Sequence, residues 1–260
     1  MTLTVFASGS TGNCALLSDG ETHILIDAGI SRKRIVDSLA LCAVSPQELT
    51  GVLITHEHTD HVSGLPMLCK LYATPVYAPR TVANHLRRAV AGVDDYLHDI
   101  PVSEPFMLGE VRVTAFPTPH DSDQSVGYRF EGSDSFGFCT DCGHVSGEMR
   151  EGLRGCRVAL VEANHDEEML RYGSYPAYLK RRILSDTGHL SNDACAALCT
   201  ELAESGTETF VLAHLSRENN RPALARKAVE TALCENGRSA KVEIAPIAGA
   251  LKVGERLCCG

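Results

Sequence analysis

The segment Thr55-His-Glu-His-Thr-Asp-His61 constrains this chain more than any other stretch. Within six positions it has three imidazoles and the carboxylate of Asp60, more metal-ligand groups than a turn needs: His56, His58, Asp60 and His61. The preceding residues 51–54 are apolar and partly β-branched, so the cluster begins where a buried strand ends. The His-x-His pair sends two rings to one side, and the next two ligands follow where the chain turns. This pattern predicts two divalent ions, although an exposed polar loop would explain any one of these residues.

Length and composition set the broad class. With 260 residues, 44% of them apolar, the chain can bury a full core and admits one large domain or two small ones. No apolar run approaches the roughly 18 to 20 residues that span a bilayer, and the N-terminal residues do not resemble a signal peptide. The eleven cysteines are scattered, as expected of reduced thiols. We expect a cytoplasmic protein with no membrane segment.

Net charge and cysteine spacing say less about the function than length and composition do. The formal charge of −9 argues against a general nucleic-acid binder, but two bound divalent ions would remove about four negative charges at the site. Cys139 and Cys142 flank Asp141, yet one such pair without a second favours core packing over a zinc site. Cys195 and Cys199 are spaced as on the inner face of one helix.

Periodicity predicts strands and helices along the whole chain. Strands are expected over residues 2–7, 14–18, 22–27, 51–54, 75–78, 105–117, 125–140, 157–163, 209–213, 241–246 and 250–253. Helices are expected over residues 31–44, 62–72, 79–91, 193–205 and 223–236. Residues 166–184 are polar, and we assign no element to them. The order predicts two similar halves, packed sheet to sheet with helices outside, in one domain over residues 1–260.

Further acidic and imidazole groups recur at or just after the ends of predicted strands. They are Asp27, His120, Asp141, Glu162, His165 and His214, and His189 stands later, in the segment 187–192 before a predicted helix. Open sheets flanked by helices place their sites at such ends. Asp27 could hold the metal-binding loop from behind, or it could cap the next helix. The turn at residues 7–13 is rich in Gly, Ser and Thr and could face an anion, with a hairpin-like turn as the alternative.

Taken in order, Asp27, the cluster at residues 56–61, His120, Asp141 and His214 resemble the five motifs of the metallo-β-lactamase fold superfamily. The resemblance covers about residues 14–214. It implies an α/β (α+β) fold, a four-layer αβ/βα sandwich with the site at one edge of the two sheets. It also implies a ligand assignment: His56, His58 and His120 for one ion, Asp60, His61 and His214 for the other, and Asp141 bridging both.

Within that superfamily the chain is similar to the YycJ/WalJ-like group of phosphodiesterases, related to tRNase Z and RNase J. The similarity lies in residues 7–14, 161–166, 188–192 and 214–222. It implies a two-metal phosphodiesterase, specifically a 5′ to 3′ exonuclease on DNA. The chain shows no inserted nuclease domain and no long basic Gly/Pro-rich arm that would grip tRNA.

The resemblance also suggests catalytic roles. A metal-bridging hydroxide would attack phosphorus, with Asp60 serving both as ligand and as catalytic residue. His189, oriented by Glu162, is our choice of general acid for the leaving oxygen, and His165 is the alternative. An ordinary helix-start cluster would also explain Glu162 and His165.

Candidate phosphate contacts come from two turns and from basic residues. They are Ser10, Asn13, Arg217, Asn219 and Asn220, with Arg171, Lys180, Arg181, Arg182 and Arg221 as further basic groups. A solvated helix face would explain residues 180–182 equally well. We see no basic patch interleaved with aromatic residues, so we do not expect sequence-specific readout.

Other functions use the same residues. A thioester or lactone hydrolase would use the same ions but would need an apolar or glutathione-type pocket, for which residues 223–260 are too few. An RNA-processing nuclease and a metal-binding protein without catalysis are further alternatives. We expect two divalent ions per chain, Zn²⁺ first and Mn²⁺ or Fe as alternatives. DNA is preferred to RNA as the partner, and monomer and homodimer are both left open.

Overall fold

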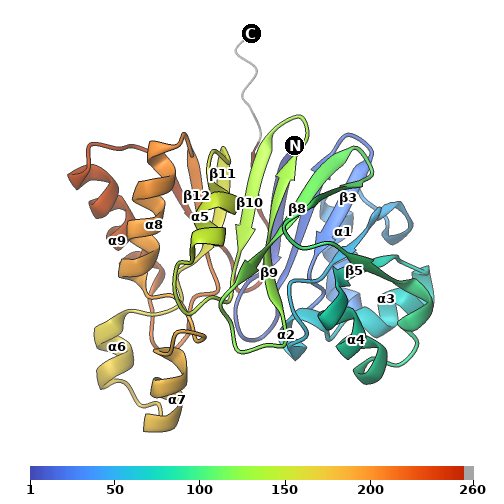
Figure 1. The fold of residues 1–260 in the computed structure, drawn as a ribbon, viewed down its shortest axis with the longest axis horizontal. Helices are drawn as coiled ribbons and strands as arrows, with labels where there is room; N and C mark the ends of the chain where they lie inside the picture. The colour runs from blue at the N-terminus through green and yellow to red at the C-terminus, as the bar shows by residue number, and fades with distance from the viewer. Residues whose placement is uncertain (255–260) are drawn as a thin grey trace.

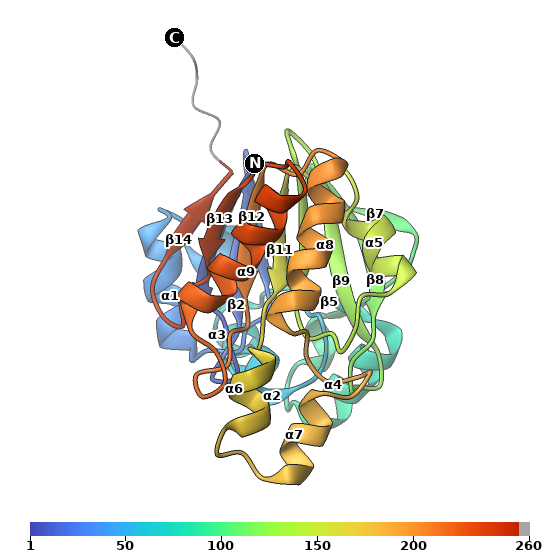
Figure 2. The ribbon, with the colours of Figure 1, turned by 90° about the vertical axis from the view of Figure 1, so that its left-hand side faces the viewer.

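The computed structural model describes residues 1–254, which form two seven-stranded sheets (Figures 1 and 2). In spatial order the first sheet contains β14 (Leu251–Val253), β1 (Thr2–Ala7), β2 (Cys14–Asp19), β3 (Thr22–Ile26), β4 (Gly51–Leu53), β5 (Val76–Pro79) and β6 (Leu97–Ile100). The second contains β13 (Lys241–Ile244), β12 (Thr209–Ala213), β11 (Val158–Glu162), β10 (Ser135–Cys139), β9 (Ser125–Glu131), β8 (Val111–Thr118) and β7 (Pro105–Leu108).

Helices cover the outer face of each sheet. On the first sheet lie α1 (Arg32–Leu41), α3 (Leu65–Tyr72) and α4 (Arg80–Ala89), and the short α2 (Thr59–Val62) lies at the end of the sandwich. On the second lie α5 (Gly147–Leu153), α8 (Asn192–Glu204) and α9 (Pro222–Glu235), and short 3-10 helices span Pro46–Glu48 and Asp94–Tyr96. Two further helices, α6 (Glu167–Tyr172) and α7 (Ala177–Ile183), extend beyond the end of the second sheet (Figure 1). The expected four-layer αβ/βα sandwich is confirmed.

The core is built by strands that are apolar on both faces. In β11, Val158 and Leu160 join the cluster between the two sheets, whereas Ala159 and Val161 join the cluster under the helices of the second sheet. Successive side chains of a strand point to opposite faces, so a continuous apolar run is what a strand between two layers requires. A third cluster packs the first sheet against its own helices.

Strand direction brings the site together. Strands β3 and β4 are parallel, with Ile26 opposite Leu53, and β10, β11 and β12 are mutually parallel, with Glu162 opposite Ala213. Parallel strands end at the same edge of their sheet. The residues that follow these strands therefore gather at one end of the sandwich, beside α2.

Three local expectations were wrong or incomplete. The predicted helix over residues 62–72 is broken into α2 and α3, because Gly64 caps α3 and a proline stands in its first turn. Strand β6 was not anticipated, since only its first and last residues are buried. Residues 166–184 form two helices of six and seven residues, too short to show a 3.6-residue period. Within residues 1–254 no helix has the length and apolar character needed to cross a membrane.

Candidate metal centre

Three residues at strand ends adopt a backbone conformation that favours glycine. Asp27 follows β3, Asp141 lies just beyond β10 and His214 follows β12, and their φ angles are 58°, 58° and 55°. A left-handed conformation at a non-glycine residue costs about 1–3 kcal/mol and persists only where the surroundings impose it. Each of these three residues ends its strand abruptly and carries a side chain into the same cluster.

The loop that carries the histidines is fixed through its backbone. The Asn13 amide donates to the Asp60 carbonyl (2.8 Å), the Gly29 amide donates to the Asn13 carbonyl (2.8 Å), and the Ala28 amide donates to the His61 carbonyl (2.7 Å). A Cβ atom at Gly29 would come within 1.5 Å of the Asp60 carbonyl oxygen, so only glycine permits this approach. The first Gly-rich turn therefore supports the ligand loop directly.

His56, His58 and His120 form the first group of ligand atoms, all within 4.8 Å of one another. The Thr55 hydroxyl donates its one proton to Asp27, so it accepts at 3.0 Å from His56 Nδ1. His120 Nδ1 donates to the Gly188 carbonyl (3.2 Å). With their Nδ1 atoms engaged, His56 and His120 offer Nε2 to the centre.

Asp60, His61 and His214 form the second group. His61 Nε2 lies 3.7 Å from Asp60 Oδ2, and His214 Nε2 lies 3.8 Å from the same oxygen. On its outer side, His61 Nδ1 donates to Asp27 Oδ2 at 2.7 Å, and both residues are fully buried. Asp27 thus holds a ligand from behind, and the structure supports no capping role: Ser31 caps α1.

Asp141 lies between the two groups. Its Oδ2 is 3.3 Å from His61 Nε2, and its Oδ1 is 3.4 Å from His214 Nδ1 and 3.9 Å from His120 Nε2. Burial alone would raise the pKa of this carboxyl, but the histidines around it hold the pKa well below its usual range. One carboxylate therefore reaches ligands of both groups.

The surroundings shift the pKa values of the ligand imidazoles in opposite directions. Burial and the neighbouring His61 lower the pKa of His56, and burial likewise lowers the pKa of His120. Burial also opposes charge on His61, but Asp27 and Asp141 outweigh it and raise the His61 pKa to about 10. Asp141, Asp60 and Glu162 similarly overcome burial and raise the pKa of His214. The centre thus combines neutral ligands with ligands that carry protons exchangeable for a cation.

The donor set fits a pair of divalent ions. Within residues 1–254, three buried atoms that face the centre have no hydrogen-bond partner: His56 Nε2, Asp141 Oδ2 and His214 Nε2. Buried polar atoms are normally paired, so unpaired atoms that converge from three segments are suited to bind a cation. Imidazole and carboxylate are ligands that Zn²⁺, Mn²⁺ and Fe all accept.

A second buried carboxylate, Glu162 at the end of β11, supports two imidazoles. Its Oε1 lies 2.7 Å from His189 Nδ1 and 3.1 Å from His214 Nδ1, and its Oε2 accepts from the Cys142 amide at 2.8 Å. Burial would raise the pKa of Glu162, but His189 and these hydrogen bonds lower it to about 2. In return Glu162 overcomes burial and raises the pKa of His189. Cys142 packs in the core against this carboxylate, as expected.

His165 lies apart from the ligand groups found among residues 1–254. Its side chain is buried, and neither ring nitrogen has a hydrogen-bond partner. Burial lowers its pKa to about 4, so it is neutral at pH 7. His189, in contrast, is partly exposed at the cleft and paired with Glu162.

The phosphate candidates fall into two sets. Ser10 and Arg217 are exposed, and Ser10 lines the cleft. Asn13 is buried, with its Nδ2 atom 2.9 Å from His61 Nε2, so it supports the ligands. Asn219 and Asn220 are 1% and 2% exposed, and the Asn220 amide donates to two backbone carbonyls and to Asn192. Both side chains are buried and Asn220 supports the loop, so the geometry does not favour phosphate contact, which stays a prediction for these two asparagines.

The centre opens into a cleft of about 240 Å³. Its wall includes His120, His189 and His214 together with Tyr175 and Arg182 from the α6–α7 region. Arg182 Nε donates to Asp121 Oδ2 at 2.6 Å, and Asp121 Oδ1 lies 3.3 Å from His120 Nε2. Sequence reasoning missed Asp121 and Tyr175. The signal available for Asp121 was its place directly after a predicted ligand.

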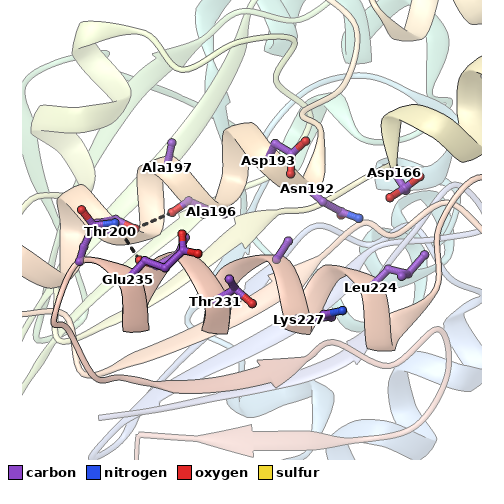
Figure 3. A pocket seen from close by; sticks show the side chains of 13 residues that line it. Asp166, Asn192, Asp193, Ala196, Ala197, Thr200, Leu224, Lys227, Thr231 and Glu235 are labelled. Carbon is purple, nitrogen blue, oxygen red and sulfur yellow. Dashed lines mark hydrogen bonds between the residues drawn. The ribbon is translucent and has the colours of Figure 1, made fainter.

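A larger hollow of about 650 Å³ lies away from the centre, between α8 and α9 (Figure 3). Alanines and polar side chains such as Thr231, Lys227 and Glu235 line it, and it contains none of the predicted metal ligands. It is an open groove between two packed helices without converging ligand atoms. We therefore assign the chemistry to the smaller cleft.

Known proteins match this chain along most of its length. Residues 22–215 match the family described as a beta-lactamase superfamily domain. The chain is 36% identical to exodeoxyribonuclease YycJ of Bacillus anthracis, over 90% of this chain and 89% of that protein. It is 37% identical to exodeoxyribonuclease WalJ of Streptococcus pneumoniae, over 89% and 87%. The metallo-β-lactamase fold protein YhfI of Bacillus subtilis is similar in structure, with a TM-score of 0.72, 17% identity and coverage of 96% and 98%.

The fold, the ligand order and these matches agree with one another. The likeness to YhfI supports the fold alone, whereas the two sequence relatives support membership of a family. The chain belongs to the beta-lactamase superfamily, within the group that contains YycJ and WalJ.

Proposed function

We propose that this chain is a two-metal phosphodiesterase that degrades DNA as an exonuclease in the 5′ to 3′ direction. Two relatives that match about nine tenths of it are named exodeoxyribonucleases. The observation that carries the proposal is the convergence of seven ligand side chains, with unpaired inner atoms, beside the Glu162–His189 pair at an open cleft.

His56, His58 and His120 would hold one ion, Asp60, His61 and His214 the other, and Asp141 would contact both. We propose Zn²⁺ as the native pair, with Mn²⁺ or Fe as alternatives, because His and Asp ligands accept all three. When bound, such a pair supplies Lewis acidity toward the phosphodiester and an activated water. Asp27 and Glu162 would keep the ligand rings in orientation.

His189 would act as the general acid. Its Nδ1 is held by Glu162 at 2.7 Å, which leaves Nε2 as the ring nitrogen able to give a proton to the leaving oxygen. Glu162 raises the pKa of His189 against the effect of burial, which favours the protonated ring at neutral pH. His165 remains the alternative donor, but its burial and low pKa make it a poor one. Asp60, 25% exposed, would face the substrate side as well as an ion.

A substrate panel tests the proposal. The purified protein, loaded with Zn²⁺ or Mn²⁺, is offered 5′-labelled single- and double-stranded DNA, RNA of the same sequence, and a thioester. Release of labelled mononucleotides from DNA at the earliest times supports 5′ to 3′ exonuclease action. Activity on the thioester alone would favour a small-molecule hydrolase, and activity on RNA alone would favour an RNA-processing enzyme. His189→Ala should keep its metal content and lose most hydrolysis, and unchanged hydrolysis would refute its role.

We further infer a single domain and a cytoplasmic setting. Residues of both sheets share one apolar cluster, which should make residues 1–260 unfold in a single cooperative transition. All nine cysteines in the described part of the chain are free, which fits a reducing compartment. Two separate calorimetric transitions would contradict the first inference, and disulfides in protein isolated from cells under thiol-blocking conditions would contradict the second.

A further inference from the structure

The segment from residue 167 to residue 184, here called the α6–α7 hairpin, carries an unusual share of exposed aromatic surface. The chain has seven Phe, seven Tyr and no Trp, and all of these aromatic residues lie in the described part. Only two of them are exposed, Tyr172 at 81% and Tyr178 at 68%. A third tyrosine, Tyr175, lies between them in sequence and lines the cleft. Large exposed aromatic groups that cluster on one element indicate a binding surface.

The hairpin is also basic in an acidic protein. It carries four basic side chains (Arg171, Lys180, Arg181 and Arg182) and two acidic ones at the start of α6, whereas the chain has a formal charge of −9. Arg181 is exposed and makes no hydrogen bond or ion pair with any residue among 1–254. Arg171 is 65% exposed and only 3.7 Å from Glu167, a weak surface pair. Basic groups therefore flank the three tyrosines of this segment, Arg171 before them and residues 180–182 after them, so aromatic and basic side chains share one element.

Hydrogen bonds and buried side chains hold the two helices of the hairpin in place. Lys180 Nζ donates to the Arg171 carbonyl at 2.9 Å and to the Gly173 carbonyl at 2.7 Å, so it ties α7 to the end of α6. Leu170 and Ile183 anchor the two helices by burial. Lys180 is engaged in these bonds and Arg182 is paired with Asp121, so Arg171 and Arg181 are the groups left to contact phosphate.

The hairpin is continuous with the proposed active site. Tyr175, Leu179 and Arg182 line the same cleft as His189 and His214. In Figures 1 and 2 both helices extend past the sandwich at the end where α2 carries the ligand loop. A ligand lying along the hairpin would therefore lead into the cleft.

We propose that the α6–α7 hairpin binds single-stranded DNA and guides the strand into the cleft; this rests on the proposed function. Bases stack on Tyr172, Tyr175 and Tyr178, and Arg171 and Arg181 contact phosphates. Stacking on exposed rings requires unpaired bases, since a duplex hides its base faces, and such binding tolerates any sequence. In a chain with a formal charge of −9, these basic groups supply positive charge that complements the phosphates of the strand.

Binding of a phosphorothioate-linked single strand, which resists cleavage, tests this by fluorescence anisotropy on the Zn²⁺-loaded protein. Tyr178→Leu should weaken binding about 5- to 150-fold, the range for loss of one stacked base, and Tyr178→Phe should retain it. Arg181→Ala should reduce the slope of log affinity against log salt by about 0.7, the value for one phosphate contact to a single strand, whereas Arg88→Ala on α4, also exposed, should not. A duplex should bind more weakly than the single strand and respond less to Tyr178→Leu.

Hydrolysis of bis(p-nitrophenyl) phosphate separates this inference from the proposed function, because that diester needs only the cleft. The hairpin variants should hydrolyse it at the wild-type rate while losing activity on single-stranded DNA. A wild-type protein inactive on both substrates would refute the proposed function but not the binding surface. Unchanged binding by Tyr178→Leu, or failure of Tyr178→Phe to retain it, would overturn the inference. So would light scattering showing that Tyr178→Leu splits a dimer without affecting DNA binding, since the occupant would then be a second copy.

Discussion

Replacing Glu162 by glutamine exchanges one carboxylate oxygen for an NH₂ group and so tests the role of this carboxylate in the metal centre. The carboxylate accepts from His189, His214 and the Cys142 amide, and its side chain has no exposed surface. An amide of the same shape has one acceptor oxygen and one NH₂ group, so it must present a donor to at least one of these donors. A buried donor left without an acceptor costs about 1–3 kcal/mol, and we expect the free energy of unfolding to fall by that amount.

The same change should alter chemistry and metal binding. Loss of the partner of His214 should weaken binding of one ion about 10- to 100-fold. If His189 is the general acid, kcat should fall about 10²- to 10⁴-fold once metal is saturating. Glu162 raises the pKa of His189, and the acid form is lost as pH rises through that pKa. Removing the charge lowers the pKa, so the alkaline limb of the pH profile should move to lower pH.

The assays are urea unfolding, metal titration against a competing chelator, and initial rates on DNA across pH at saturating metal. Glu201→Gln is the matched control, because that glutamate is exposed and, among residues 1–254, paired only with Arg150 at 2.8 Å on the surface. It should change stability by less than about 1 kcal/mol and leave the pH profile unmoved. A Glu162→Gln protein with wild-type metal affinity and an unshifted alkaline limb would refute the role we give to this carboxylate.

Two further substitutions and one binding measurement test how the ligands are supported. Asp27→Asn should weaken Zn²⁺ binding about 10- to 100-fold in equilibrium dialysis, because His61 loses its charged partner. Asp37→Asn, at an exposed position, should leave the affinity unchanged, and equal Zn²⁺ affinities of the two variants would contradict the prediction. Gly29→Ala should abolish folding or lower the free energy of unfolding by more than about 4 kcal/mol, because its Cβ would meet the Asp60 carbonyl at 1.5 Å. Gly147→Ala is the control: its Cβ meets no atom of the described residues within 4 Å, so urea unfolding should show almost no change. At pH 7 His61, with a pKa raised to about 10, carries a proton that an incoming ion must displace, so Zn²⁺ binding should release protons and strengthen as pH rises. Calorimetry in two buffers of different ionisation enthalpy measures this release, and identical heats would count against it.

Most of the expected metal ligands could be predicted from short segments of the sequence. His56, His58, Asp60 and His61 lie within one short segment, and Asp141 and His214 follow apolar runs that become strands. A run that ends in a polar residue marks the edge of a sheet, and parallel strands end at a common edge, so such residues gather without detailed knowledge of packing. Most strands, though not β6, and the longer helices were predictable for the same reason, since their period is local.

Other features depended on contacts between distant segments. Glu162 was expected to orient His189, but only the packed structure shows that it also holds His214. Asn220 belonged to a motif that suggested phosphate contact, yet its amide is consumed by carbonyls 56 and 57 positions away. The α6–α7 hairpin was invisible because helices of six and seven residues show no clear period.

The amino-acid order alone thus determined which groups can bind a cation and at which strand ends they stand, because side-chain chemistry and strand period are properties of short segments. Only the tertiary structure decided which nitrogen of each ring faces the centre, which polar groups are buried as supports, and which tyrosines remain exposed beside the cleft. Those outcomes depend on partners from distant parts of the chain, because whether a side chain is buried or hydrogen-bonded is settled only when those parts have packed together.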